Sequence, residues 1–165
     1  MRCLSITVGA RAVDTVVAFA ADEHLRTSAL PDLPARAMTL LPGLRGHRCD
    51  NGAGLTFAQE LADTEVAHLF EHVAVELMAL AGSPDTLAGR TTWDFRRDGR
   101  GVFHVLVDYD DDLIAIGALT EAVPIVRWLC APNEDVVETL PDVRAAVARL
   151  RKLRRRRSSL DAPTA

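Results

Sequence analysis

The sequence predicts an α+β domain in which a few helices pack on a small β-sheet. Residues 2–8 and 102–107 have the alternation and the β-branched composition that are typical of strands. Residues 64–80 contain no Gly or Pro and indicate a helix, and residues 112–129 indicate a second one. The order of these strands and helices favours an α+β fold with the helix of residues 64–80 at its centre.

The other segments are less regular. Residues 11–25 are apolar and fit a strand or a helix equally well. Residues 28–54 are rich in Pro and Gly, so we expect mostly loop there, with a short apolar piece at residues 38–41. Residues 85–101 are polar and flanked by Gly, which is typical of a loop or a hairpin.

Local signals indicate where the helices begin and end. The central helix begins near residues 55–57, with an expected break near residues 63–64, and Gly82-Ser83-Pro84 ends it. Pro124 is expected to kink or divide the second long helix, because proline has no backbone N–H to donate. Residues 134–153 predict one or two final helices.

Length and charge indicate one domain with a basic tail. A chain of 165 residues is long enough for one hydrophobic core, which we assign to residues 1–148. Residues 149–165 begin with a run of Arg and Lys, and we expect a helix end that frays into a disordered tail. The alternative is a contact with nucleic acid or an acidic partner, but the acidic remainder of the chain and its scarce aromatic residues argue against nucleic acid.

The cysteines and the apolar segments bear on cellular location. Cys3, Cys49 and Cys130 are odd in number and widely spaced, which argues against a disulfide framework and favours the reducing cytoplasm. The N-terminal residues lack the pattern of a secretory signal, and no apolar run is expected to span a bilayer. We therefore expect a cytoplasmic protein without membrane association, and its sequence leaves homo-oligomer formation open.

The most informative motif is His68-Leu69-Phe70-Glu71-His72, the H-x-x-E-H order of the inverted zinc peptidases. Residues four apart on a helix share one face, so His68 and His72 can hold one metal ion together. Two neutral imidazoles suit Zn²⁺, and Glu71 is placed as the general base for a metal-bound water. The alternative is a pair of polar residues at the edge of the core.

A catalytic zinc needs a third protein ligand, and the sequence offers several. Cys49 is one candidate because it precedes the His pair by about twenty residues, as zinc-ligand spacings often do. Glu138, on a late helix, is another, because inverted zinc peptidases take a Glu from a downstream helix. Glu121 and Asp112 are weaker alternatives, and each carboxylate can equally be a solvated surface charge.

Three further residues have candidate roles around this metal. Glu76 lies one turn beyond His72 and can orient that imidazole through its second nitrogen. Arg90, in Gly89-Arg90-Thr91, can clamp a substrate carboxylate. His47 lies two residues before Cys49, and we group it with Arg90 as a substrate-binding candidate, although it can also supply a metal ligand or remain a surface side chain.

Several of these segments together resemble a known family, the N-terminal domain of cyanophycin synthetase. The resemblance rests on Gly46-His47-Arg48-Cys49, on the helix from Glu65 to Leu77, on Gly89-Arg90-Thr91 and on Val105-Leu106-Val107-Asp108-Tyr109. It covers most of residues 43–130. The full synthetase adds an ATP-grasp domain and a Mur-ligase-like domain, which build a polymer of Asp and Arg; this sequence contains neither.

The resemblance implies a domain that holds the polymer and, in some members, cuts it at a metallopeptidase-like site. It implies that His68 and His72 bind the metal, that Glu71 is catalytic and that Arg90 meets the polymer. The sequence departs from the family pattern at Met78, in the loop before Gly89 and after Tyr109. These departures bear on the identity of the substrate more than on the metal site.

The sequence thus predicts a metal-binding protein, a Zn²⁺-dependent hydrolase of the metallopeptidase type that cleaves amide bonds in a peptide-like, cyanophycin-like polymer. The alternative is a non-catalytic module that binds the polymer or assists a separate amino-acid-polymer synthetase. Metal content distinguishes the two, because only the first requires a bound ion.

Overall fold

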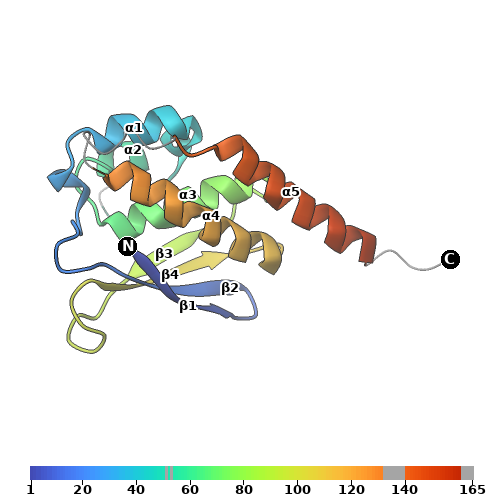
Figure 1. The fold of residues 1–165 in the computed structure, drawn as a ribbon, viewed down its shortest axis with the longest axis horizontal. Helices are drawn as coiled ribbons and strands as arrows, with labels where there is room; N and C mark the ends of the chain where they lie inside the picture. The colour runs from blue at the N-terminus through green and yellow to red at the C-terminus, as the bar shows by residue number, and fades with distance from the viewer. Residues whose placement is uncertain (51, 53, 132–139, 161–165) are drawn as a thin grey trace.

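The computed structural model describes residues 1–50, 52, 54–131 and 140–160. Its β-sheet is antiparallel and has four strands in the order β1-β2-β4-β3. The strands are β1 (Arg2–Val8), β2 (Ala12–Ala18), β3 (Gly89–Thr92) and β4 (Val102–Asp108). The helices lie in a layer over one face of this sheet (Figure 1). The α+β fold predicted from the sequence is therefore confirmed.

Within the described residues, five α-helices and two short 3₁₀-helices make up the second layer. The α-helices are α1 (Leu33–Leu40), α2 (Phe57–Glu60), α3 (Val66–Leu80), α4 (Asp112–Cys130) and α5 (Val143–Leu160). The 3₁₀-helices are η1 (Thr27–Ala29) and η2 (Pro42–Gly46). Helix α3 carries the H-x-x-E-H motif and packs against β3, β4 and α4, so the motif lies on a central helix as predicted.

The period-two alternation of the strands decides which sheet face is buried. On β2 and β4 every second side chain is buried, and these point toward the helices: Val13, Thr15, Val17, Phe103, Val105 and Val107. The side chains between them are half-buried or exposed, including Leu106 at 36% exposure. The helices therefore cover one face of the sheet and leave the other face open.

The segments that we could not assign, or expected to be loop, contain strand β2 and helix α1. Residues 11–25 supply strand β2, and the expected break near residues 63–64 separates α2 from α3. Helix α1 lies within the segment that we expected to be mostly loop. Pro34 sits in the first turn of α1, where a missing N–H costs nothing, and Leu33 and Ala37 bury one face. A proline there begins the helix rather than breaking it.

Two expectations concern helix α4. It continues through Pro124, which lies on the exposed side of the helix, so Pro124 does not divide it, and the kink that we expected as the alternative stays a prediction. By length and composition α4 is apolar enough to cross a membrane, although we expected no such run. In the structure it is a core helix: 44% of its most apolar window is buried, and it packs on α3, α5 and the sheet.

Helix α5 extends to Leu160, well into the segment that we assigned to a disordered basic tail. Its side chains Val147 and Leu150 are buried against the body. Gly117 of α4 permits this close approach, because a Cβ there would lie 2.6 Å from Leu150 Cδ2. The boundary proposed at residue 148 therefore falls inside a helix that belongs to the fold.

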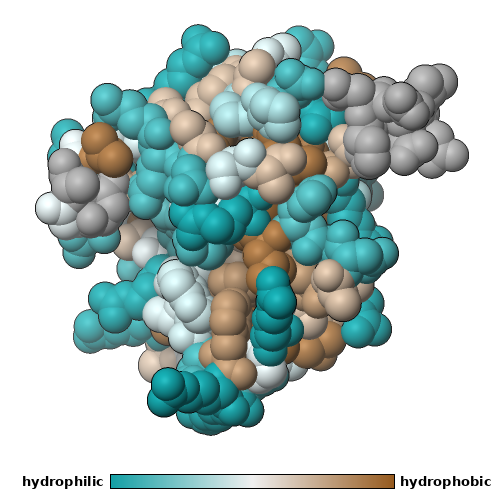
Figure 2. All heavy atoms as spheres, turned by 90° about the vertical axis from the view of Figure 1, so that its left-hand side faces the viewer, coloured by the Kyte–Doolittle hydropathy of each residue, from teal (hydrophilic) through white to brown (hydrophobic). Residues whose placement is uncertain are grey.

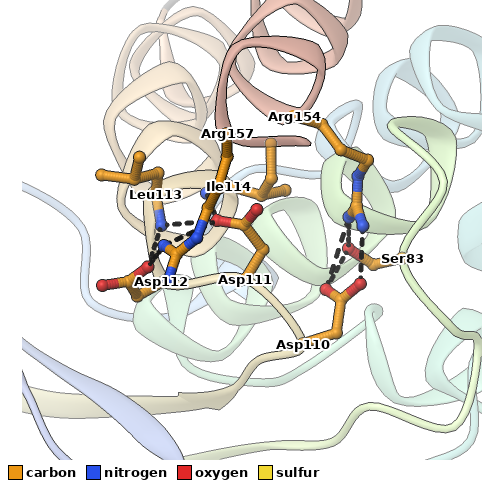
Figure 3. Close-up of polar contacts among 8 residues, drawn as sticks. All are labelled: Ser83, Asp110, Asp111, Asp112, Leu113, Ile114, Arg154 and Arg157. Carbon is orange, nitrogen blue, oxygen red and sulfur yellow. Dashed lines mark hydrogen bonds and ion pairs between the residues drawn. The ribbon is translucent and has the colours of Figure 1, made fainter. Parts of the chain in front are cut away.

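Basic side chains of α5 attach it to the acidic loop between β4 and α4 (Figure 3). Arg154 binds Asp110 at 2.7 Å and the Ser83 hydroxyl at 2.6 Å, while Arg157 pairs with Asp111 and Asp112. Closer to the start of α5, Arg149 pairs with Glu121 at 2.6 Å. Part of the basic run therefore anchors α5 to the rest of the domain, which we did not expect from the sequence.

Replacing Arg154 should loosen this attachment. Arg154→Ala removes the ion pair with Asp110 and the bond to Ser83, so we expect the free energy of unfolding to fall by about 1 kcal/mol. Lys152→Ala, which removes an exposed cation from the same helix, should change it by less than about 0.5 kcal/mol. Urea unfolding of both variants gives the comparison, and equal losses would contradict this assignment.

Candidate metal centre

Three ligand atoms converge at the start of α3. His72 Nε2 lies 3.1 Å from His68 Nε2 and 3.2 Å from Cys49 Sγ, and Cys49 Sγ lies 3.8 Å from His68 Nε2. Cys49, His68 and His72 therefore place one donor atom each within 4.8 Å of the others. The sequence predicted all three residues as ligands, and the structure brings them together.

The loop that carries Cys49 is fixed from both sides. Before Cys49, Leu44 of η2 is fully buried; after it, Arg48 forms a β-bridge with Thr56 and the Phe57 N–H donates to His47 O. Thr56 and Gln59 form a capping box that starts α2. The short helix α2 then places the Phe57 ring on His72, stacked at 3.7 Å between centroids. This stacking restricts the orientation of the imidazole.

The second nitrogen of each histidine has its own partner. His68 Nδ1 lies 2.9 Å from the Thr64 hydroxyl. His72 Nδ1 lies 2.9 Å from His47 Nδ1, and His47 Nε2 lies 2.9 Å from Glu76 Oε2. The Glu76 carboxylate accepts from His47 Nε2–H, so His47 Nδ1 can accept from His72 Nδ1–H. His72 Nε2 is then unprotonated and directed toward Cys49, as a metal ligand requires.

The spacing of the three donor atoms fits zinc. With Zn–N near 2.0–2.1 Å and Zn–S near 2.3 Å, tetrahedral angles place two nitrogens about 3.3 Å apart and a nitrogen and a sulfur about 3.6 Å apart. The corresponding distances here are 3.1 Å, 3.2 Å and 3.8 Å. Two imidazoles and one thiolate are also a donor set that zinc prefers. The residues present therefore fit the predicted ion.

Burial keeps the histidines neutral. It lowers the pKa of His72 to about 2, with smaller contributions from His68 and His47, and it lowers the pKa of His68 as well. Burial raises the pKa of the Cys49 thiol, and a hydrogen bond with Glu60 raises it further. The cluster without a metal thus has neutral imidazoles and a protonated thiol. A bound cation would favour the thiolate form of Cys49 instead.

Glu71 lies beside this cluster but is held by the sheet. Its carboxylate accepts a 2.6 Å hydrogen bond from the Thr91 hydroxyl of β3. A Cβ at Gly89 would lie 2.5 Å from the Glu71 side chain, so β3 approaches α3 this closely because residue 89 is glycine. Burial raises the pKa of Glu71 to about 7; the Thr91 bond opposes this, and the charge of Glu60 adds to it.

Glu60 was not among the candidates predicted from the sequence, and His47 contacts residues that the sequence did not indicate. Glu60 on α2 hydrogen-bonds the Cys49 thiol. Burial lowers the pKa of His68 and raises that of Glu71; the charge of Glu60 opposes the first shift and adds to the second. The capping box at residues 56–59 was the available signal, because it places Glu60 in the first turn of a short helix beside the Cys49 loop. His47, which we grouped with the substrate-binding residues, lies between His72 and the Glu76 carboxylate.

The other predicted residues lie elsewhere. Arg90 is exposed and alternates along β3 with Gly89 and Thr91, which face Glu71, so its side chain belongs to the opposite sheet face. Glu121 and Asp112, the weaker alternatives for a third ligand, pair with Arg149 and Arg157 of α5. Glu138 lies outside the described residues. Of the candidates for a third ligand in the described part of the chain, Cys49 is therefore the one that lies with His68 and His72.

The fold and the site define an α+β domain whose central helix contributes two histidines to a three-donor cluster. Residues 15–131 of this chain match the family of cyanophycin synthase-like N-terminal domains, and the chain belongs to this family. The matched region begins in β2, ends just after α4 and includes Cys49, Glu60, the α3 motif and Thr91. A comparison with curated proteins found no match.

The raised pKa of Glu71 predicts a pH-dependent stability for the metal-free protein. The pKa of Glu71 is about 7 in the folded protein, and we take its ordinary value of 4.5 for the unfolded chain. The contribution of this carboxyl to the free energy of unfolding is therefore fully present below pH 4.5 and is lost as the pH rises through 7. Glu71→Gln cannot ionise. Between pH 5 and pH 8 the wild type should therefore lose about 2 kcal/mol of unfolding free energy relative to this variant. Parallel urea-stability profiles would contradict the assignment.

The contact between His47 and His72 predicts an effect on metal affinity. His47→Ala removes the group that fixes the tautomer of His72, so zinc affinity should fall about 10- to 100-fold. His24→Ala, an exposed histidine, is the matched control and should leave affinity unchanged. Competition against a chromophoric chelator measures both. Equal affinities for the two variants would show that His47 does not support the site.

Proposed function

We propose that the protein is a zinc-dependent hydrolase of the metallopeptidase type that cleaves amide bonds in a peptide-like polymer. The observation that carries the proposal is the convergence of Cys49 Sγ, His68 Nε2 and His72 Nε2, with both imidazoles oriented through their second nitrogens. Three protein ligands are the number typical of a catalytic zinc, whose fourth position is left for water or substrate. Structural zinc sites usually have four.

In this proposal zinc supplies a Lewis acid that polarises the scissile carbonyl and activates water. Glu71 accepts the proton from that water and passes it to the leaving amine. Without a metal, burial raises the pKa of Glu71 to about 7, and a bound cation would lower it, so that the carboxylate could accept the proton. The Thr91 hydroxyl, at 2.6 Å, keeps the carboxylate at the edge of the cluster.

The polymer is proposed from family membership. A cyanophycin synthase-like N-terminal domain is named for an enzyme that handles a peptide-like polymer, so we propose a cyanophycin-like polymer as the substrate class and a separate synthetase as a partner. The reducing cytoplasm remains the proposed location, because a thiolate ligand at Cys49 requires a reduced cysteine.

Glu60 supports a second candidate function, a non-catalytic polymer-binding or synthetase-accessory module. Its carboxylate already contacts the Cys49 thiol. If that carboxylate became a fourth ligand, the metal site would be closed, as structural zinc sites are. The protein would then hold the polymer or the synthetase without cutting anything.

One set of variants tests both candidates. Wild type should contain about one zinc per chain by elemental analysis, and His68→Ala/His72→Ala should contain none. Glu71→Gln should retain zinc but lose at least about 100-fold in cleavage of the polymer, because the proton acceptor is gone. Cleavage is followed by the release of new amino termini.

Two outcomes would contradict the hydrolase. Wild-type rates for Glu71→Gln would exclude the proposed base. Full zinc occupancy with no polymer cleavage by the wild type, and with activity still absent in Glu60→Gln, would favour the binding module.

A further inference from the structure

Strand β1 is an edge strand of the sheet, and within the described residues no strand lies on its outer side. Six of its seven residues are exposed, among them Leu4 at 54% and Val8 at 45%. Residues 3–8 contain no charge and no proline. Monomeric proteins protect sheet edges with charges, prolines, bulges or very short strands, and β1 has only a shift of register between Cys3 and Ser5. It therefore presents a long, uncharged edge to which another strand can be added.

The opposite edge of the sheet has a different character. Strand β3 has four residues and includes the exposed Arg90, so this edge is short and charged, as protected edges usually are. Helix α3 packs on it, where the Thr91 hydroxyl donates to Glu71. A partner bound at β1 would therefore lie at the other edge of the sheet from Glu71.

Helix α4 lies along β1 and runs in the opposite direction. Near its end, Arg127 Nε donates to Met1 O, just before the start of β1. Just before its start, the Tyr109 hydroxyl donates to Gly9 O, just after the end of β1. Figure 1 shows the same course, with α4 beginning near the turn between β1 and β2. The helix layer and the sheet layer therefore run side by side along this edge of the domain.

One side of α4 is uncovered along this edge. The buried side of the helix faces the core, and Glu121 pairs with Arg149 of α5. The uncovered side consists of four residues spaced three or four apart, which we call the α4 stripe: Leu113, Ile116, Thr120 and Pro124. Three of them are exposed, Leu113 at 44%, and Ile116 is half-buried. Arg127, three residues beyond Pro124, continues the stripe and reaches Met1, so the stripe lies on the β1 side of the helix.

Exposed apolar residues alone do not select this surface. The side of the molecule on the left of Figure 1 also shows a strip of hydrophobic residues between hydrophilic ones (Figure 2). A second copy of the chain needs more, because a two-fold interface must match itself in shape and in charge. The uncharged edge of β1 and the α4 stripe meet this requirement together.

The α4 stripe matches itself about Thr120. When two α4 helices pack in antiparallel orientation around a two-fold axis at Thr120, residues equally distant from Thr120 face each other. Ile116 then meets Pro124 of the second copy, and Leu113 meets the second copy's Arg127 along its aliphatic part. No two like charges of the stripe face each other in this arrangement.

The charges at the two ends of α4 favour the antiparallel orientation. Asp111 and Asp112 at its start both pair with the same guanidinium, that of Arg157, so two carboxylates share one cation there. Arg127 is the basic residue of the last turn. An antiparallel second copy brings its Arg127 next to Asp112, and the opposed helix macrodipoles favour the same orientation. Charge complementarity thus points to a second copy of this chain as the occupant.

The same two-fold axis passes over the middle of β1. Thr120 precedes Arg127 by seven residues, which is about 10.5 Å along a helix. Arg127 contacts Met1, and about 10.5 Å along a strand corresponds to about three residues. Thr120 therefore lies over Leu4 and Ser5, near the centre of β1. One axis suits both layers, so the sheet and the helix layer can continue into the second copy together.

We propose that β1 and the α4 stripe form the interface of a two-fold symmetric homodimer. Its two sheets join through antiparallel β1 strands, and its two α4 helices pack on each other in antiparallel orientation around Thr120. The inference goes beyond the proposed function and does not depend on it, because neither β1 nor α4 contributes a residue to the metal cluster.

Sedimentation velocity of the full chain tests the dimer. One chain has a mass of 17.9 kDa, so the wild type at micromolar concentration should sediment as a species of twice that mass. Thr120→Lys places two like charges at the axis and should raise the dissociation constant of the dimer at least about tenfold. Thr92→Lys is the matched control, an exposed threonine on the opposite edge strand, and should leave the dimer unchanged. Circular dichroism checks that both variants fold.

Cross-linking locates the axis in folded protein. In a chain with Cys3→Ser, which removes the exposed native cysteine, Thr120→Cys should be joined to its copy by a short bismaleimide, because packed helices lie about 8–10 Å apart. Thr92→Cys in the same chain should remain uncross-linked at the same protein concentration. The fraction of covalent dimer is measured by denaturing electrophoresis.

Three results would overturn the proposal. A wild type that sediments as a monomer up to the highest micromolar concentrations would exclude the dimer. A dimer that the two lysine substitutions weaken equally, or that cross-links equally well from residues 92 and 120, would place the interface on another surface.

Discussion

Most of this fold follows from one constraint: helix α3 is buried on almost every side, yet it carries ionisable side chains inward. Eleven of its fifteen residues are buried, among them Glu71, His72 and Glu76, which are 4%, 5% and 7% exposed. A buried polar group without a partner costs about 1–3 kcal/mol, and a buried charge costs more. Each of these three residues therefore requires a partner from another part of the chain.

The surrounding segments meet that requirement. The loop after η2 supplies His47 to both His72 and Glu76, and β3 supplies Thr91 to Glu71. Space comes from two glycines, because a Cβ at Gly43 would collide with the Glu76 carboxylate and one at Gly89 with Glu71. These positions are far apart in the sequence, and each of them contacts α3. The contacts that pack the loop and β3 on the helix are therefore also the contacts that assemble the candidate site.

The sequence revealed the parts of the site that depend on local spacing. His68 and His72 are four residues apart on a helix, and Glu71 lies between them, so their proximity follows from helix geometry alone. Cys49 could be proposed as a ligand from its spacing, but Glu138 was also open, and Glu121 and Asp112 remained as weaker alternatives. What separated Glu121 and Asp112 from the cluster was their pairing with α5, a tertiary contact that no local pattern encodes.

The same distinction holds for the fold. Strands β1 and β4 and helices α3 and α4 have periodic patterns of their own and were predicted near their observed positions. Helix α1 was missed because its eight residues lie within a segment rich in proline and glycine, and α5 was underestimated because its charges are stabilised by the acidic loop after β4. Arg90 was misplaced because strand alternation, which puts it opposite Thr91, becomes informative only once β3 is known.

Binding of a cation at the cluster would change the protonation state of Glu71. Without a metal, the site has neutral imidazoles, a protonated thiol and a carboxyl that is about half ionised near pH 7. A divalent cation at the three donors favours the thiolate at Cys49 and, through its charge, lowers the pKa of the adjacent Glu71. Burial thus keeps Glu71 partly protonated only while the cluster has no cation. If the proposed zinc binds at these three donors, it would therefore favour the carboxylate form of Glu71, the form that the proposed general base requires.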